Sequence, residues 1–123
     1  MPVYGGKGRD GDIKIPALTN LVKDNDEFTI GDHVRVKYDR RFHIDRTDPN
    51  RDIHLCRCLA TPCHTEDSIC YYATDTADED VPGGVFTGDT LFIAGCGKFF
   101  EGTGGQMYEA FSKLGKLPDD TFV

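Results

Sequence analysis

Apolar and polar residues alternate along two early stretches of the chain, and a period of two predicts β-strands. EFTIGDHVRVKY, residues 27–38, alternates on both sides of Gly31-Asp32 and therefore predicts a hairpin. IHLCRCLAT, residues 53–61, alternates as well and is followed by Pro62. Because proline cannot donate a hydrogen bond to a neighbouring strand, we expect this strand to stop at residue 61.

Two further strand-like stretches and one helical stretch follow. ICYYAT, residues 69–74, is short and aromatic, as strands often are. VFTGDTLFIAG, residues 85–95, has apolar runs on both sides of a polar turn and predicts two strands, the second of which could also be a tight loop. In GGQMYEAFSKLGK, residues 104–116, apolar residues recur at helical spacing, and Gly115 suits the C′ position. Several strands with one helix predict an α+β fold.

The composition fits one soluble domain with a modest core. The chain has 123 residues and a formal net charge of −7. This charge and the lack of a basic stripe argue against nucleic acid and anionic membranes as partners. No apolar run approaches the ~20 residues of a membrane span, and MPVYGGKGRD lacks the features of a secretory signal. Five cysteines without a C-x-x-C pair fit a reducing compartment, so we expect a cytoplasmic location, with the mitochondrion as the alternative.

Two groups of residues are candidates for metal chemistry. His64 and Asp89 each follow a predicted strand, and strand ends tend to converge on one edge of a sheet. Imidazole and carboxylate are common zinc ligands, but both residues are also common in turns, so spacing leaves the two interpretations open. His54, Cys56 and Cys58 lie on one face of their predicted strand, where the cysteines could equally belong to the core.

Longer strings are more specific than these spacings. LATPCHTEDSICYY, FTGDTLFIAGCGKFFEGT and the leading PVYGG together resemble glyoxalase II, the hydroxyacylglutathione hydrolase of the metallo-β-lactamase superfamily. The resemblance runs from about residue 3 to the end, except for the charged stretch at 39–52, which looks like an inserted loop. It implies that residues 1–123 form a partial metallo-β-lactamase domain, an αββα sandwich with a two-metal centre at one edge.

The resemblance also implies roles for four residues. His64 would bind one metal ion and Asp89 would bridge two, both expected to be zinc. Lys98 would bind the glutathione moiety of the substrate, and Phe100, where many relatives have tyrosine, would pack near it. The implied reaction is hydrolysis of the glutathione thioester S-D-lactoylglutathione to D-lactate and glutathione, a step of methylglyoxal detoxification.

Two motifs of the family are not found in this chain. The family carries T-H-x-H-x-D-H before the segment that resembles PVYGG and G-H-E-Y-T after the helix, and both motifs supply metal ligands. We therefore expect a fragment of a glyoxalase II that is inactive by itself. Two alternatives remain: a non-catalytic protein that binds a partner, and a module that binds one metal ion through His64, Asp89 and either a cysteine or His54.

Overall fold

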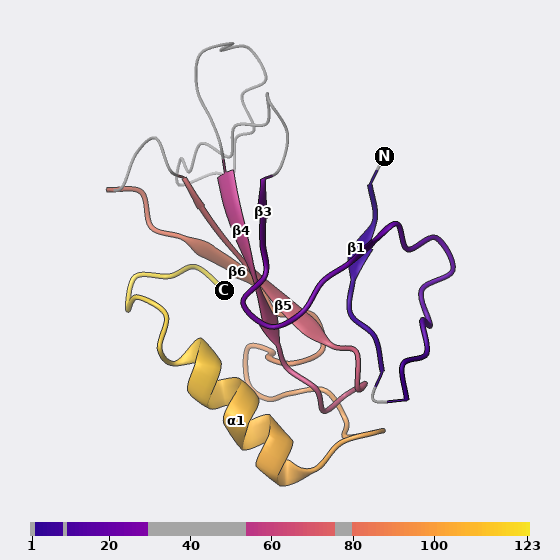
Figure 1. The fold of residues 1–123 in the computed structure, drawn as a ribbon. Helices are drawn as coiled ribbons and strands as arrows, with labels where there is room; N and C mark the ends of the chain where they lie inside the picture. Colours follow the sequence, from indigo (N-terminus) through magenta and orange to yellow (C-terminus); the bar gives the residue numbers. More distant parts are fainter. Residues whose placement is uncertain (1, 9, 30–53, 76–79) are drawn as a thin grey trace.

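The computed structural model describes residues 2–8, 10–29, 54–75 and 80–123. They form a four-stranded antiparallel sheet in the order β3-β4-β5-β6, a separate parallel pair β1-β2, and one helix (Figure 1). The elements are β1 (Tyr4–Gly5), β2 (Asn20–Leu21), β3 (Glu27–Thr29), β4 (His54–Ala60), β5 (Ile69–Asp75), β6 (Gly84–Phe86) and α1 (Gly104–Leu114). This mixture agrees with the predicted α+β class.

The pairing of β4 with β5 determines which residues share a face of the sheet. Cys58 lies opposite Tyr71, and Leu59 lies opposite Cys70. Directly opposed residues point to the same side of an antiparallel pair. Leu59 and Cys70 form one buried cluster with Tyr72 of β5 and Val85 of β6, and two partly buried leucines pack against it, Leu114 at the end of α1 and Leu117 just after the helix. This cluster is the core between the sheet and the C-terminal region.

The opposite face of the sheet is covered near its edge by the N-terminal segment. The ring of Tyr4 stacks on that of Phe28, with centroids 3.9 Å apart, and Phe28 meets Tyr71 edge-on at 6.2 Å. The Tyr71 hydroxyl donates to the Tyr4 carbonyl at 3.5 Å. These contacts hold β1 against the sheet on the side opposite to the core cluster.

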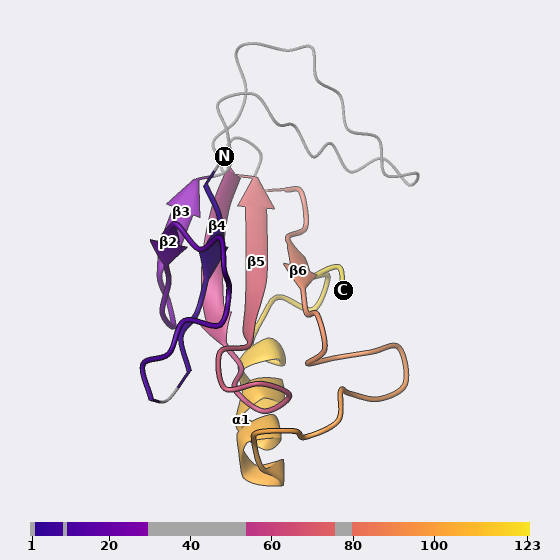
Figure 2. The ribbon, with the colours of Figure 1, turned by 90° about the vertical axis from the view of Figure 1, so that its right-hand side faces the viewer.

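Helix α1 lies beyond the end of the sheet where β4 leads into β5 (Figure 2). Thr103 caps it: its hydroxyl accepts from the backbone N–H of Gln106, and the Gln106 side chain accepts from the backbone N–H of Thr103. Met107 and Ala110 are buried against Cys63. The helix predicted over 104–116 is confirmed, although it ends two residues earlier.

Gly115 differs in detail from its prediction. It is the C-cap residue itself, with right-handed helical angles (φ −69°, ψ −1°); its N–H donates to the Phe111 carbonyl, and the next N–H, of Lys116, donates to the Lys113 carbonyl. The helix therefore ends without the left-handed residue that a glycine at C′ would supply. Among the residues that the structure describes, no helix is long and apolar enough to cross a membrane.

The strands predicted over 53–61 and 69–74 are confirmed, and of the two alternatives for residues 91–95 the structure shows the tight loop. Within residues 91–95 the structure shows a single bridge, between Phe92 and Gly95, and Ile93 is fully exposed. The segment bends back on itself instead of pairing with another described strand, so its apolar side chains gain no partner face. The first strand of the predicted hairpin is β3. Its turn at Gly31-Asp32 and the charged loop at 39–52 lie outside the described residues.

Candidate metal and substrate site

His64 lies in the turn that joins β4 to β5. The backbone N–H of Thr61 donates to the Ser68 carbonyl at 3.0 Å, and the hydroxyls of Thr65 and Ser68 lie 2.8 Å apart. Within this closed turn the N–H of Cys63 donates to the Thr65 carbonyl at 3.1 Å. The turn is thus fixed on both sides of His64, whose side chain is 21% exposed.

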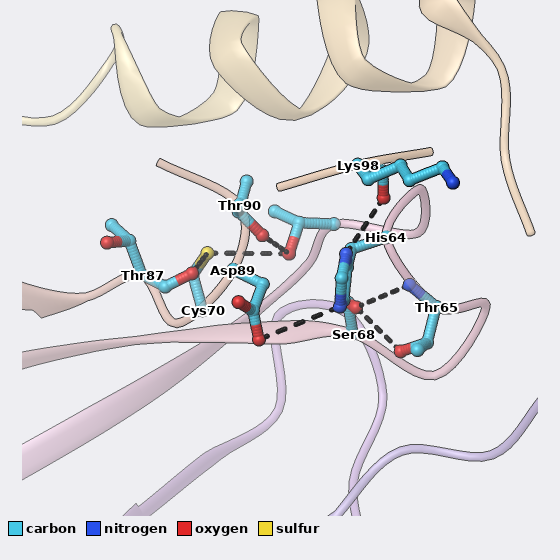
Figure 3. Close-up of polar contacts among 9 residues, drawn as sticks. His64, Thr65, Ser68, Cys70, Thr87, Asp89, Thr90 and Lys98 are labelled. Atoms are coloured by element: carbon cyan, nitrogen blue, oxygen red, sulfur yellow. Dashed lines mark hydrogen bonds and ion pairs between the residues drawn. The ribbon is translucent and has the colours of Figure 1, made fainter. Parts of the chain in front are cut away.

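Asp89 lies in the turn that follows β6. The N–H of Thr90 donates to the Thr87 carbonyl at 2.9 Å, and Gly88 adopts a left-handed conformation with φ +50°. The buried hydroxyl of Thr90 donates to the buried hydroxyl of Thr61 at 3.1 Å (Figure 3). Because β4 and β6 both run antiparallel to β5, the C-terminal ends of β4 and β6 lie at the same end of the sheet. The threonine pair links the two turns there.

This arrangement brings the imidazole and the carboxylate face to face. The Nε2 atom of His64 lies 3.8 Å from Oδ2 of Asp89, and its Nδ1 atom lies 2.8 Å from the Lys98 carbonyl oxygen (Figure 3). A carbonyl oxygen only accepts hydrogen bonds, so Nδ1 carries the proton. In the neutral ring, Nε2 therefore directs its lone pair toward Asp89.

The geometry of this pair fits two ligands of one metal ion. Zinc–nitrogen and zinc–oxygen bonds of about 2.0–2.2 Å are long enough for one ion to join two atoms at this separation. A histidine ligand usually donates its second ring N–H to a carbonyl or carboxylate, as His64 does to Lys98. The contact is also too long for a direct hydrogen bond between His64 and Asp89.

Gly97 allows the segment after Asp89 to pass close to both candidate ligands. Its N–H donates to the Asp89 carbonyl at 2.8 Å. A Cβ atom at this position would lie 2.9 Å from Nδ1 of His64 and would collide with the Asp89 carbonyl. The residue pattern alone did not reveal this requirement. The only signal was the glycine within the CGK string, which shows its meaning once the three segments are placed together.

Lys98 and Phe100 lie beside the same histidine. The Phe100 ring meets the His64 ring edge-on, with centroids 5.0 Å apart, and Nζ of Lys98 lies 5.0 Å from the centre of the Phe100 ring. Both side chains are exposed. The structure therefore gathers all four residues singled out in the sequence at one place on the surface, although they come from three segments.

Comparison with known proteins shows which proteins this chain resembles. No protein-family model matches the chain. A hydroxyacylglutathione hydrolase-like protein from Gallus gallus is 39% identical over 124 residues, which cover 100% of this chain and 34% of that protein. A probable hydroxyacylglutathione hydrolase from Schizosaccharomyces pombe is 40% identical over 122 residues, covering 98% of this chain and 36% of that protein. The chain is similar to part of a glyoxalase II. It spans about one third of these two relatives.

The likeness to a hydroxyacylglutathione hydrolase is stronger over a shorter stretch, and the fold is similar to that of a metallo-β-lactamase. The cytoplasmic isozyme of hydroxyacylglutathione hydrolase from Saccharomyces cerevisiae is 67% identical over 51 residues, which cover 41% of this chain and 18% of that protein. A metallo-β-lactamase from Staphylococcus aureus superposes with a TM-score of 0.62 at 22% identity, covering 96% of this chain and 32% of that structure. The expected partial metallo-β-lactamase fold is confirmed.

Fewer metal ligands are gathered here than the resemblance to glyoxalase II implies. Among the residues with described side chains, no group of three or more histidine, cysteine, aspartate or glutamate residues could hold a metal ion. His64 and Asp89 thus fit a metal ion as a pair of donors, while a tetrahedral zinc site needs four ligands.

The cysteines on β4 are core residues. Cys56 and Cys58 are at most 1% exposed, and burial raises the pKa of each thiol to about 11, with smaller contributions from Cys58 at Cys56 and from Asp26 at Cys58. A thiol that is hard to ionise is a poor metal ligand. Of the two interpretations of the group on this strand, the structure favours core packing for the cysteines. The side chain of His54 is outside the described part.

Proposed function

We propose that this chain forms part of a hydroxyacylglutathione hydrolase that converts S-D-lactoylglutathione and water into D-lactate and glutathione. The observation that carries the proposal is the position of His64, whose Nε2 faces the Asp89 carboxylate while its ring touches Phe100. The names of the relatives from Gallus gallus and Schizosaccharomyces pombe support it.

His64 and Asp89 would hold a metal ion in this proposal, and we infer zinc. A bound zinc ion supplies a water of lowered pKa and polarises a carbonyl group. The chain's own contribution is to fix the ligands: the Lys98 carbonyl holds His64 in the tautomer with a free Nε2, and the Gly97 N–H holds the backbone of Asp89. The ligands that complete the coordination would come from residues other than these two.

Lys98 and Phe100 would bind the glutathione part of the substrate. Glutathione is an anionic tripeptide, so the exposed ammonium of Lys98 can pair with one of its carboxylates. The Phe100 ring offers an apolar surface between Lys98 and His64. Because phenylalanine lacks a hydroxyl group, it would contribute packing alone. The thiolate product is a good leaving group, so the site needs no strong acid at the sulfur.

The proposed location follows the relatives. Two similar Saccharomyces cerevisiae proteins are named as the cytoplasmic isozyme and the mitochondrial form of hydroxyacylglutathione hydrolase. We propose that this chain belongs to the cytoplasm, or alternatively to the mitochondrion. The proposed partner is the small thioester substrate. The net charge of −7 makes nucleic acid an unfavourable partner.

The test combines zinc titration with substrate binding on the purified 123-residue chain. We expect zinc to shift the His64 ring signals in NMR spectra, and His64→Ala and Asp89→Asn to abolish this response. Glu109→Gln, on the exposed side of α1, is the matched carboxylate control and should respond as the wild type. We also expect S-methylglutathione, a thioether that cannot be hydrolysed, to shift the backbone signals of Lys98 and Phe100.

The same samples are assayed for hydrolysis of S-D-lactoylglutathione. We expect no turnover by the chain alone, because two donors do not complete a zinc site. Turnover that depends on zinc would show that the chain is a working enzyme and would contradict this expectation of inactivity. A chain that binds neither zinc at His64 nor S-methylglutathione at Lys98 would contradict the proposed function and favour a non-catalytic role. Zinc binding without thioether binding would favour a simple metal-binding module.

A further inference from the structure

The segment 98–101, here called the substrate arm, connects the Asp89 turn to α1. Its side chains are exposed, and Gly97 and Gly102 pack tightly at its two ends, the former against Asp89 and the latter against the backbone of Cys63. Among the described residues, the arm is attached between these ends by the bond from His64 to the Lys98 carbonyl, by the contact of the Phe100 ring with His64 and by the side chain of Glu101.

The Glu101 carboxylate joins three segments of the chain. Its Oε2 atom accepts the backbone N–H of Glu66 at 2.7 Å, and its Oε1 atom pairs with Nζ of Lys14 at 2.6 Å. Glu66 belongs to the same turn as His64, whereas Lys14 comes from the N-terminal segment. One side chain therefore ties the substrate arm both to the histidine turn and to the region between β1 and β2.

Stability alone is a weak explanation for this arrangement. The side chains of Lys14 and Glu101 are 49% and 32% exposed, and pairs with such exposure usually contribute little to folding. The hydrogen bonds to Lys14 and to the Glu66 N–H lower the pKa of Glu101, so the carboxylate is charged near neutral pH. The two bonds of Glu101 lead to the histidine turn and to the N-terminal segment, and they therefore fix where the arm lies relative to His64.

We propose that Glu101 is a positioning residue, whose carboxylate holds Lys98 and Phe100 beside His64 so that a glutathione thioester can meet both the arm and the histidine. The identity of the ligand rests on the proposed function. The position of the arm does not, because it can be measured without any ligand. In this role Glu101 touches neither substrate nor metal and acts through the backbone of the arm and of the histidine turn.

Three variants separate the possible causes. Glu101→Gln keeps an oxygen that can accept the Glu66 N–H but loses the charge that pairs with Lys14. Glu101→Ala removes both contacts. Lys113→Met, on the last turn of α1, is the control, because it breaks another exposed ion pair, between Lys113 and Asp24 at 2.9 Å, together with the bond from Lys113 to the Ala60 carbonyl at 2.7 Å.

The first readout is the nuclear Overhauser contact between the rings of His64 and Phe100 in the full chain. We expect this contact to be lost in Glu101→Ala and kept in Glu101→Gln and in Lys113→Met. We also expect the His64 tautomer with protonated Nδ1 to be lost in Glu101→Ala alone. An alanine variant that keeps both the ring contact and the tautomer overturns the proposal. Loss of the ring contact in Lys113→Met would also overturn it, since the effect would then be general destabilisation.

The second readout is the affinity for S-methylglutathione. We expect Glu101→Ala to weaken binding and Glu101→Gln to bind nearly as well as the wild type. If the wild-type chain binds no S-methylglutathione while the ring contact responds as expected, the proposed function fails and the positioning role stands. If Glu101→Ala leaves both the ring contact and the affinity unchanged, the positioning role fails and the proposed function stands.

Discussion

At the scale of single residues, the candidate site depends on a position without a side chain. We predict that Gly97→Ala impairs zinc binding at His64, because the added Cβ atom would collide with the Asp89 carbonyl and crowd Nδ1 of His64. Such overpacking forces the backbone and side chains to shift, which typically costs about 1–3 kcal/mol of folding free energy. Gly95→Ala in the same loop is the control, since a Cβ atom there meets nothing within 4 Å.

Zinc titrations and urea unfolding of both glycine variants check this prediction. We expect a weaker zinc response and lower stability for Gly97→Ala, and wild-type behaviour for Gly95→Ala. Wild-type zinc binding by Gly97→Ala would mean that the close approach of the two turns is not needed to hold the ligand pair.

Sequence reasoning named candidate metal ligands but not what holds them. Residue type and position after strands made His64 and Asp89 candidates, the resemblance to glyoxalase II gave them roles, and the structure places them face to face. The tautomer of His64 could not be predicted, because it depends on a carbonyl group 34 residues away in the chain. The need for glycine at position 97 was equally hidden, since it arises from the meeting of two turns that are distant in sequence.

At the scale of secondary-structure elements, β4 carries a pH dependence of its own. Burial raises the pKa of the Cys56 and Cys58 thiols from an ordinary value near 9 to about 11. Between these values the unfolded chain loses protons that the folded chain keeps. We therefore predict that stability is retained below about pH 9 and falls as the pH rises, by up to about 1.4 kcal/mol per pH unit for each thiol.

Urea unfolding at several pH values between 8 and 11 measures this slope. We expect Cys56→Ala to be less stable than the wild type at pH 8, since it leaves a cavity, but to lose stability less steeply above pH 9. The comparison of slopes removes the contribution of groups common to both proteins. Equal slopes for the two proteins would show that the Cys56 thiol does not contribute to the alkaline loss of stability.

Elements were predictable where the pattern and the environment agree. Strand β4 was predicted from its alternation and α1 from its apolar stripe, and the structure pairs β4 on both edges and adds a capping box to α1. The segment 91–95 is as apolar as a strand, yet it forms only one bridge. An apolar run shows that a segment can pair but not that a partner strand is beside it, and this is why the sequence left a strand and a tight loop as alternatives here.

At the scale of the whole molecule, a negative protein is proposed to bind an anionic ligand. The net charge is −7, and the histidine turn itself carries Glu66 and Asp67. Lys14 interacts electrostatically with both of these residues and pairs with Glu101, so it offsets negative charge near the substrate arm. We predict that Lys14→Met weakens the binding of S-methylglutathione, because the negative charge of the Glu101 carboxylate is then no longer offset by Lys14.

The double variant Lys14→Met/Glu101→Gln tests whether charge is the cause. It removes the carboxylate charge together with its partner and keeps an acceptor for the Glu66 N–H, so we expect it to recover most of the lost affinity. The loss in Lys14→Met should also shrink at 1 M salt, where charges are screened beyond about 3 Å. If the double variant binds as poorly as Lys14→Met at both salt concentrations, Lys14 acts through the shape of the N-terminal segment. Recovery would instead show that the chain accommodates an anion by local neutralisation, against the sign of its overall charge.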